Sequence, residues 1–116
     1  MSATGWIGVD LDGTLARYET WRGPAHIGEP IWPMVDRVRQ WLAAGQEVRI
    51  FTARVGPQPD VNDTIRAREA IDAWCVKHIG RALPITATKD YAMRELWDDR
   101  AVQVIPNTGA RADGSG

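Results

Sequence analysis

Apolar residues occur in short blocks that alternate between strand-like and helix-like patterns, with glycine- and proline-rich segments between them. The first block, residues 6–11, is a continuous apolar run bounded by Gly5 and Gly13, which is typical of a buried strand. Further runs of this kind predict additional strands at residues 48–51, 84–88, 95–98 and 101–105.

Two longer segments have the periodicity of amphipathic helices. In residues 33–44 the first helical turn accommodates Pro33, and apolar side chains recur on one face. That face consists of Met34, Val38, Trp41 and Leu42. In residues 61–79 the apolar stripe is formed by Ile65, Ile71, Trp74, Cys75 and Ile79. Asp60 or Asn62 is placed to cap the second helix, and Gly80 to end it.

The alternation of strands and helices predicts an α/β fold, a parallel sheet of about five strands with helices on both faces. We expect one domain over residues 1–105 and a flexible tail over residues 106–116, which is small and polar. Residues 13–33, called the flap below, contain repeated glycines and prolines, which predicts a loop or small hairpin. In such sheets ligands bind beyond the carboxyl ends of the strands.

Composition narrows the class of protein. The 116 residues are 44% hydrophobic and 25% charged, which excludes a mostly disordered chain, a coiled coil and a collagen-like repeat. A formal charge of −1 argues against a general nucleic-acid binder. A single cysteine, Cys75, fits a reducing compartment. No apolar run approaches the ~20 residues that span a bilayer, and no signal peptide is visible. We therefore expect a soluble, cytoplasmic protein that does not bind membranes.

The first predicted strand ends in the segment Asp10-Leu11-Asp12-Gly13-Thr14. Side chains two residues apart on a strand point the same way, so Asp10 and Asp12 can face one site. Two carboxylates so close need a cation, a proton or a shared water between them. Gly13 lets the backbone turn tightly, and Thr14 offers a hydroxyl and an amide at that turn. An ordinary Asp-Gly turn is the alternative explanation of this segment alone.

The other predicted strands also end in groups suited to phosphate chemistry. Thr52 and Arg54 follow the second strand and suit anion binding, and Lys89 follows the third. Asp98 and Asp99 end the fourth, where adjacent acids are unfavourable without a cation to hold. Taken singly, each of these has an ordinary explanation as a solvated or turn residue.

Taken in order, these groups resemble the haloacid dehalogenase-like (HAD) superfamily, whose members are mainly phosphatases, over residues 5 to about 105. The resemblance implies a Rossmann-like sheet, with Asp10 as the nucleophile that takes the phosphoryl group and Asp12 as general acid and base. It also implies that Thr52 and Lys89 hold the phosphate, with Thr14 and Arg54 contributing. Mg²⁺ would be bound by the side chains of Asp10 and Asp98 and the backbone carbonyl of Asp12, with Asp99 acting directly or through water.

Two features depart from the usual pattern of that family. Lys89 lies only nine residues before Asp98, where many members place a helix, and Lys77 inside the second predicted helix is the fallback. The flap and residues 53–88 leave no room for a cap domain, so we expect a capless member with an open site. Such a site suits a substrate that covers it, or a homo-oligomer in which a neighbouring copy supplies the lid.

The leading hypothesis is therefore a Mg²⁺-dependent phosphohydrolase acting through an aspartyl-phosphate. Tyr18, Trp21 and Trp32 in the flap offer stacking faces for a nucleotide or nucleic-acid end, although they would equally pack the flap onto the body. Two alternatives stay open. One is a catalytically idle relative that binds phosphate-bearing ligands or a protein. The other is a receiver-like domain, which the position of the acidic pair at the start of the chain disfavours.

Overall fold

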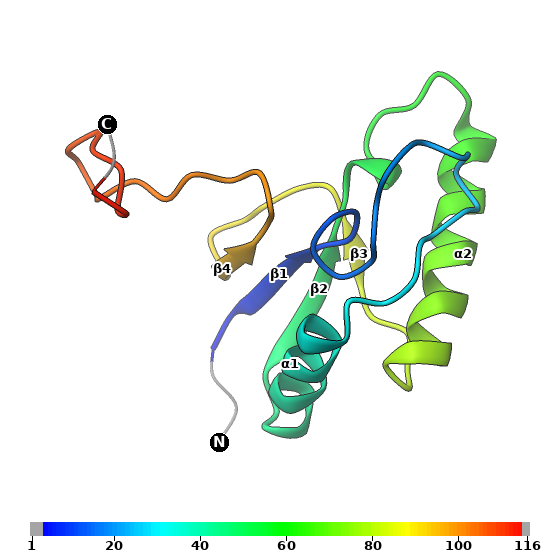
Figure 1. The fold of residues 1–116 in the computed structure, drawn as a ribbon, viewed down its shortest axis with the longest axis horizontal. Coiled ribbons are helices and arrows are strands. Elements are labelled where there is room, and N and C mark those ends of the chain that lie inside the picture. The colour runs from blue at the N-terminus through cyan, green and yellow to red at the C-terminus, as the bar shows by residue number, and fades with distance from the viewer. Residues whose placement is uncertain (1–3, 115–116) are drawn as a thin grey trace.

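The structure is a computed structural model that describes residues 4–114. Its elements follow one another from a first strand to a last strand, with two helices between them (Figure 1). The strands are β1 (Trp6–Asp10), β2 (Glu47–Phe51), β3 (Ile85–Thr86) and β4 (Met93–Trp97). The helices are α1 (Trp32–Ala43), α2 (Val61–His78) and the short 3-10 helix η1 (Ala53–Val55). None of the helices among residues 4–114 is long and apolar enough to cross a membrane.

The four strands form one parallel sheet in the order β3-β2-β1-β4. Asp10 at the end of β1 pairs with Phe51 at the end of β2, and Phe51 pairs with Thr86 at the end of β3. The carboxyl ends of all four strands therefore lie at one edge of the sheet. The predicted α/β fold is confirmed, with four strands instead of about five. Among the described residues, the flap is loop up to the start of α1, and residues 53–88 contain only η1, α2, β3 and their loops, so neither segment contains a cap domain.

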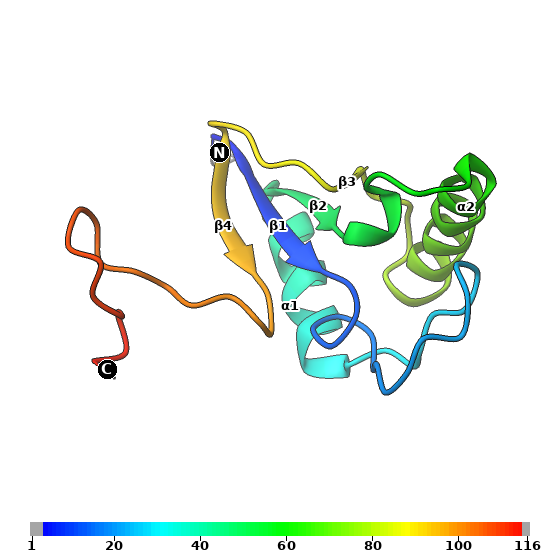
Figure 2. The ribbon, with the colours of Figure 1, turned by 90° about the horizontal axis from the view of Figure 1, so that it is seen from above.

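Both helices pack on the same face of the sheet. Ile7 and Val9 of β1 belong to one apolar cluster with residues of α1, such as Val35, and of α2, such as Ile71. The chain moves across the sheet in one direction from β1 to β2 and from β2 to β3. Because crossover connections between parallel strands are right-handed, both of these connections place their helix on the same face. The expectation of helices on both faces is wrong in this respect. Figure 2 shows α1 on one side of the sheet and the connection from β3 to β4 on the other.

The opposite face is closed by a large aromatic side chain instead of a helix. Trp6 is fully buried, and its ring stacks on Phe51 with 6.5 Å between the ring centroids. The guanidinium of Arg49 lies 4.5 Å from the centre of the Trp6 ring. The indole Nε1 of Trp6 donates a hydrogen bond of 2.8 Å to Asp90, which belongs to the connection from β3 to β4. This connection covers the second face near the amino ends of the strands.

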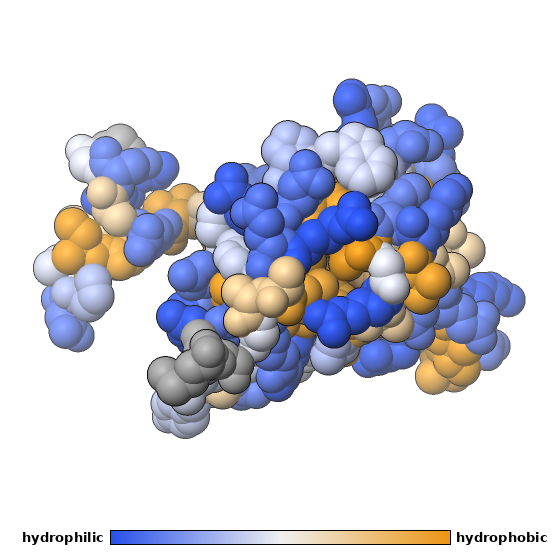
Figure 3. Space-filling view, turned by 90° about the horizontal axis from the view of Figure 1, so that it is seen from below, coloured by the Kyte–Doolittle hydropathy of each residue, from blue (hydrophilic) through white to orange (hydrophobic). Residues whose placement is uncertain are grey.

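Figure 3 views the molecule from the amino-terminal side of the strands. Hydrophilic residues dominate this view, and apolar residues show only in small areas between them. A separate arm, made by the end of the chain, projects to one side. The candidate site must therefore be sought at the other end, beyond the carboxyl ends of the strands.

Residues 101–105 do not form the predicted fifth strand of the sheet. They leave the body as an extended arm that turns back on itself (Figure 1). The amide of Ile105 donates to the carbonyl of Ala110, and the amide of Ala112 donates to the carbonyl of Gln103. A strand parallel to β4 would need a crossover of a dozen or more residues, and only residues 98–100 separate the two segments. The described part of the predicted tail, residues 106–114, thus makes the returning half of this turn.

Candidate functional site

A cleft with a volume of about 750 Å³ lies beyond the carboxyl ends of β1, β2 and β4. The loops that follow these three strands supply its polar lining. Six of the side chains predicted from the sequence line it: Asp10, Asp12, Thr52, Arg54, Asp98 and Asp99. Parallel pairing brings these residues together, although more than 80 positions separate Asp10 from Asp98 in the chain.

Three carboxylates converge at one end of this cleft. One oxygen each of Asp10, Asp98 and Asp99 lies within 4.8 Å of the others. Burial, the hydrogen bond with Asp99 and the negative charges of Asp98 and Asp99 together raise the pKa of Asp10 to about 7, and burial is the largest of these causes. A cation would remove this repulsion. Mg²⁺ takes hard oxygen ligands, usually one or two carboxylates together with waters and substrate oxygens, so these residues fit the ion.

The turn after β1 fits closely against this group of acids. Gly13 has a φ of +87°, and a Cβ at that position would lie 2.5 Å from Oδ2 of Asp99. The hydroxyl of Thr14 accepts a hydrogen bond of 3.0 Å from the amide of Asp99. Its oxygen lies 3.4 Å from Oδ2 of Asp10 and 3.3 Å from Oδ1 of Asp99, so it can donate its proton to either carboxylate. Thr14 therefore links the first strand end to the last.

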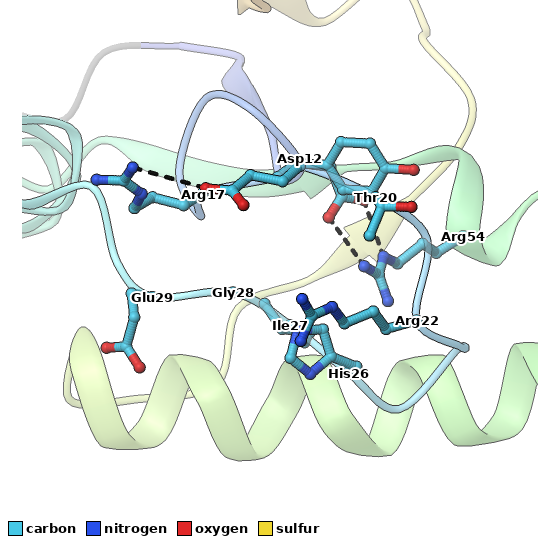
Figure 4. Close-up of a pocket in the computed structure, with 11 residues that line it drawn as sticks. Asp12, Arg17, Thr20, Arg22, His26, Ile27, Gly28, Glu29 and Arg54 are labelled. Carbon is cyan, nitrogen blue, oxygen red and sulfur yellow. Dashed lines mark hydrogen bonds and ion pairs between the residues drawn. The ribbon is translucent and has the colours of Figure 1, made fainter.

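Asp12 points to a different partner. The guanidinium of Arg54 binds both of its carboxylate oxygens, through Nε at 2.8 Å and one terminal nitrogen at 2.9 Å (Figure 4). The other terminal nitrogen donates to the carbonyl of Pro24 at 3.1 Å and to that of Gly23 at 3.4 Å. Trp21 covers the guanidinium, with 4.9 Å between its ring centre and Cζ. Arg54 is buried and thus ties Asp12 to the flap.

Thr52 is held between β2 and η1. Its amide donates to the carbonyl of Thr86 at 2.9 Å, which continues the pairing of β2 with β3. Its Oγ1 accepts a hydrogen bond of 3.2 Å from the amide of Arg54 and so caps η1. The hydroxyl proton remains available to a ligand in the cleft.

The structure does not bring Lys89 to this cleft. Lys89 is exposed and does not line the cleft, and the next residue, Asp90, is bound to Trp6. Trp6 is the first residue of β1 and Asp10 the last, so Asp90 is anchored at the far end of the strand from the three acids. The connection after β3 has no helix that would hold a lysine beside the strand ends.

Two polar side chains of the cleft were not predicted as site residues from the sequence. Arg100 lines the cleft next to the acids, and its amide donates to Oδ1 of Asp98 at 2.8 Å. Gln58 also lines it, with its side-chain nitrogen 3.2 Å from the carbonyl of Ala53. The position of Arg100 directly after the acidic pair was a usable signal. Nothing in the sequence pattern distinguishes Gln58.

The exposed aromatic residues of the flap separate into two groups. Tyr18 and Trp21 are 47% and 55% exposed and line the cleft, as a stacking role requires. Trp32 lies instead beside His78 of α2, with 6.1 Å between the ring centroids. Trp21 also packs on Arg54, so it takes part in holding the flap to the body.

Comparisons with known proteins identify the fold and no family. No protein-family model matches the chain, and no curated protein matches it at a significant level. A solved structure of a conserved protein from Bacteroides thetaiotaomicron is similar, with a TM-score of 0.54 and 21% sequence identity. The similarity covers 90% of this chain and 84% of the other. At this identity the chain shares the α/β fold of that protein, and the likeness extends no further.

Proposed function

We propose that this protein is a Mg²⁺-dependent phosphohydrolase of the HAD type, which acts through an aspartyl-phosphate. The observation that supports this most is the convergence of Asp10, Asp98 and Asp99 beside an Asp12 held by Arg54, all in the cleft at the strand ends. The substrate would be a phosphate monoester, with nucleotide or nucleic-acid-end phosphates as one class. A cytoplasmic location and a neighbouring copy that covers the open cleft belong to the same proposal.

Asp10 would act as the nucleophile. Its pKa near 7 leaves the carboxylate protonated in part at neutral pH in the protein alone. A bound Mg²⁺ would offset the charge of the three acids and of the phosphate, so that an ionised Asp10 could approach the phosphorus. A carboxylate oxygen would then form a bond to phosphorus while the bond to the leaving oxygen breaks.

Asp12 would transfer the protons of both half-reactions. In the first it gives a proton to the leaving oxygen, and in the second it takes one from the water that attacks the aspartyl-phosphate. The second step releases inorganic phosphate and restores Asp10. The two hydrogen bonds from Arg54 fix the plane of the Asp12 carboxylate in this conformation, and Arg54 would have to release one of the two oxygens for Asp12 to carry the proton.

The phosphate oxygens would be held by groups on the opposite wall of the cleft. The hydroxyl of Thr52 and the side chain of Arg54 lie there, and Arg100 adds a further positive charge. A role for Lys89 in holding phosphate stays a prediction, since it requires a movement of the connection after β3. Arg54 and Arg100 are the cations that line the cleft in this conformation.

Turnover of p-nitrophenyl phosphate and of a panel of organic phosphates, with Mg²⁺ and with EDTA, tests the proposal. We expect Mg²⁺-dependent release of phosphate by the wild type and none by Asp10→Asn, because the amide is nearly isosteric but a poor nucleophile. Asp36→Asn, a change at an exposed carboxylate of α1, is the matched control and should retain full activity. Activity that persists in EDTA or in Asp10→Asn would overturn the assignment.

A catalytically idle phosphate-binding module is the second candidate, and the position of Lys89 outside the cleft favours it. This candidate predicts binding of inorganic phosphate or of phosphate esters without turnover. Equilibrium binding measured beside the turnover assay separates the two functions.

A further inference from the structure

A second, smaller pocket lies within the flap next to the cleft. Its volume is about 220 Å³, and it meets the cleft at Asp12, Tyr18 and Arg54, which line both. The rest of its wall comes mainly from flap residues, among them Arg17, Arg22 and His26 (Figure 4). A molecule bound in the cleft can therefore extend past Asp12 into this pocket.

The charged groups of the pocket are unevenly paired. Arg54 is neutralised by Asp12 at 2.8 Å, and Arg17 lies 3.9 Å from Glu19. Arg22 and His26 have no hydrogen-bond or ion-pair partner among the side chains of residues 4–114. Both line the pocket together with Arg54, and Figure 4 shows Glu29 away from them, at the other end of the pocket.

Arg54 is already bound to Asp12, but Arg22 and His26 line the pocket with no carboxylate from the described part of the chain bound to either, so both side chains are available to an anionic ligand. Arginine binds phosphate through paired hydrogen bonds, and an imidazole can donate one in either protonation state. Asp10, Asp98 and Asp99 do not line the pocket, so it lacks the proposed nucleophile and the clustered acids that would cleave a phosphate placed there. A phosphate bound in the pocket would be held and left intact.

We propose that the flap pocket binds a second phosphate group of the substrate, so that the preferred substrates contain two phosphates on one molecule. This inference rests on the proposed function and deepens it. The second phosphate can be terminal, as in a nucleoside bisphosphate, or can be the phosphodiester next to a phosphorylated nucleic-acid end. Both offer the same charged oxygens to Arg22 and His26.

The test compares adenosine 3′,5′-bisphosphate and a 3′-phosphorylated adenosine dinucleotide with the better of the two adenosine monophosphates. In the wild type with Mg²⁺ we expect kcat/KM for at least one two-phosphate compound to exceed that for the monophosphate by about tenfold, the effect of one charge-assisted hydrogen bond. Preference for the bisphosphate or for the dinucleotide identifies the source of the second phosphate.

Arg22→Gln should reduce this ratio towards one, because it removes the unpaired charge of the flap. Arg39→Gln, at an exposed arginine of α1 outside both cavities, is the matched control and should leave the ratio unchanged. A wild-type ratio near one, or a ratio that Arg22→Gln does not change, overturns the inference about the flap pocket. Mg²⁺-dependent turnover of the monophosphate would in either case still support the proposed function.

Equilibrium binding of the same compounds in EDTA, measured by titration calorimetry, separates the two claims. If the wild type binds a two-phosphate compound more tightly and Arg22→Gln removes that preference, the pocket assignment holds even when no compound is hydrolysed. If the protein hydrolyses neither these compounds nor p-nitrophenyl phosphate and shows no preference for a second phosphate, both claims are wrong.

Discussion

Asp10→Asn should stabilise the metal-free protein in a pH-dependent way. Asp10 has a pKa of about 7 in the folded protein against an ordinary value of 3.8, because it is buried beside two other acids. Between these two values the folded state keeps the proton that the unfolded state has released. Unfolding then releases a proton, so stability falls as pH rises through this window and levels off above pH 7.

The difference between the two pKa values corresponds to ~4 kcal/mol when one unit is 1.36 kcal/mol. Solvent screening of this partly exposed carboxylate brings the expected cost to about 2–3 kcal/mol. Asp10→Asn mimics the protonated side chain and does not titrate. In EDTA the variant should therefore be about 2–3 kcal/mol more stable than the wild type above pH 7, with the difference closing towards pH 4.

Urea unfolding followed by tryptophan fluorescence from pH 4 to 8.5 measures this difference. Asp36→Asn should give no pH-dependent difference, since Asp36 is exposed on α1. Saturating Mg²⁺ should raise the stability of the wild type at pH 8 and change that of Asp10→Asn less. A difference that is constant with pH, or a variant less stable than the wild type at pH 8, would refute the reasoning that burial and the two neighbouring acids raise the pKa of Asp10.

Three further changes test other parts of the site. Gly13→Ala should lower the free energy of unfolding by ~2 kcal/mol and weaken Mg²⁺ binding, because the added methyl group meets Asp99. Gly80 also has a positive φ but has open space around it, so Gly80→Ala should cost ~1 kcal/mol and leave Mg²⁺ binding intact. Arg54→Met should lower the free energy of unfolding by about 3 kcal/mol and make the flap more sensitive to limited proteolysis. Equal proteolysis rates for the variant and the wild type would contradict the role of Arg54 in holding the flap. Lys89→Met should leave KM for phosphate esters within about twofold if the lysine stays outside the cleft, and a much larger rise would restore the role implied by the resemblance.

The sequence predicts best what local pattern determines. The bounds of β1, α1, β2 and α2 agree with the predicted ones within one or two residues, because each has a clear apolar run or periodicity, and Asp60 caps the start of α2 as expected. The apolar stripe of α2 is less accurate, since Ile65 is 49% exposed. Periodicity identifies a face, but the neighbours decide how much of it is covered.

Features that depend on the path of the chain were not predictable in this way. The pattern of residues 101–105 is strand-like, and only the short link after β4 prevents a parallel pairing there. The approach of Asp10, Asp98 and Asp99 follows from strand order and was expected. The pairing of Asp12 with Arg54 and the distance of Lys89 from the cleft depend on the course of the flap and of the connection after β3.

The place of β4 in the sheet has a consequence for metal affinity. β4 pairs with β1 on one side only, and the loop that follows it supplies two of the three clustered carboxylates. Edge strands open locally more readily than central ones, and each opening of β4 would displace Asp98 and Asp99 from Asp10. A cation bound by all three acids would in turn make this opening less favourable, by the free energy of binding that is lost when the acids separate. Hydrogen exchange at the β4 amides would then report occupancy of the metal site, and substitutions that loosen this edge would weaken the metal without touching a ligand.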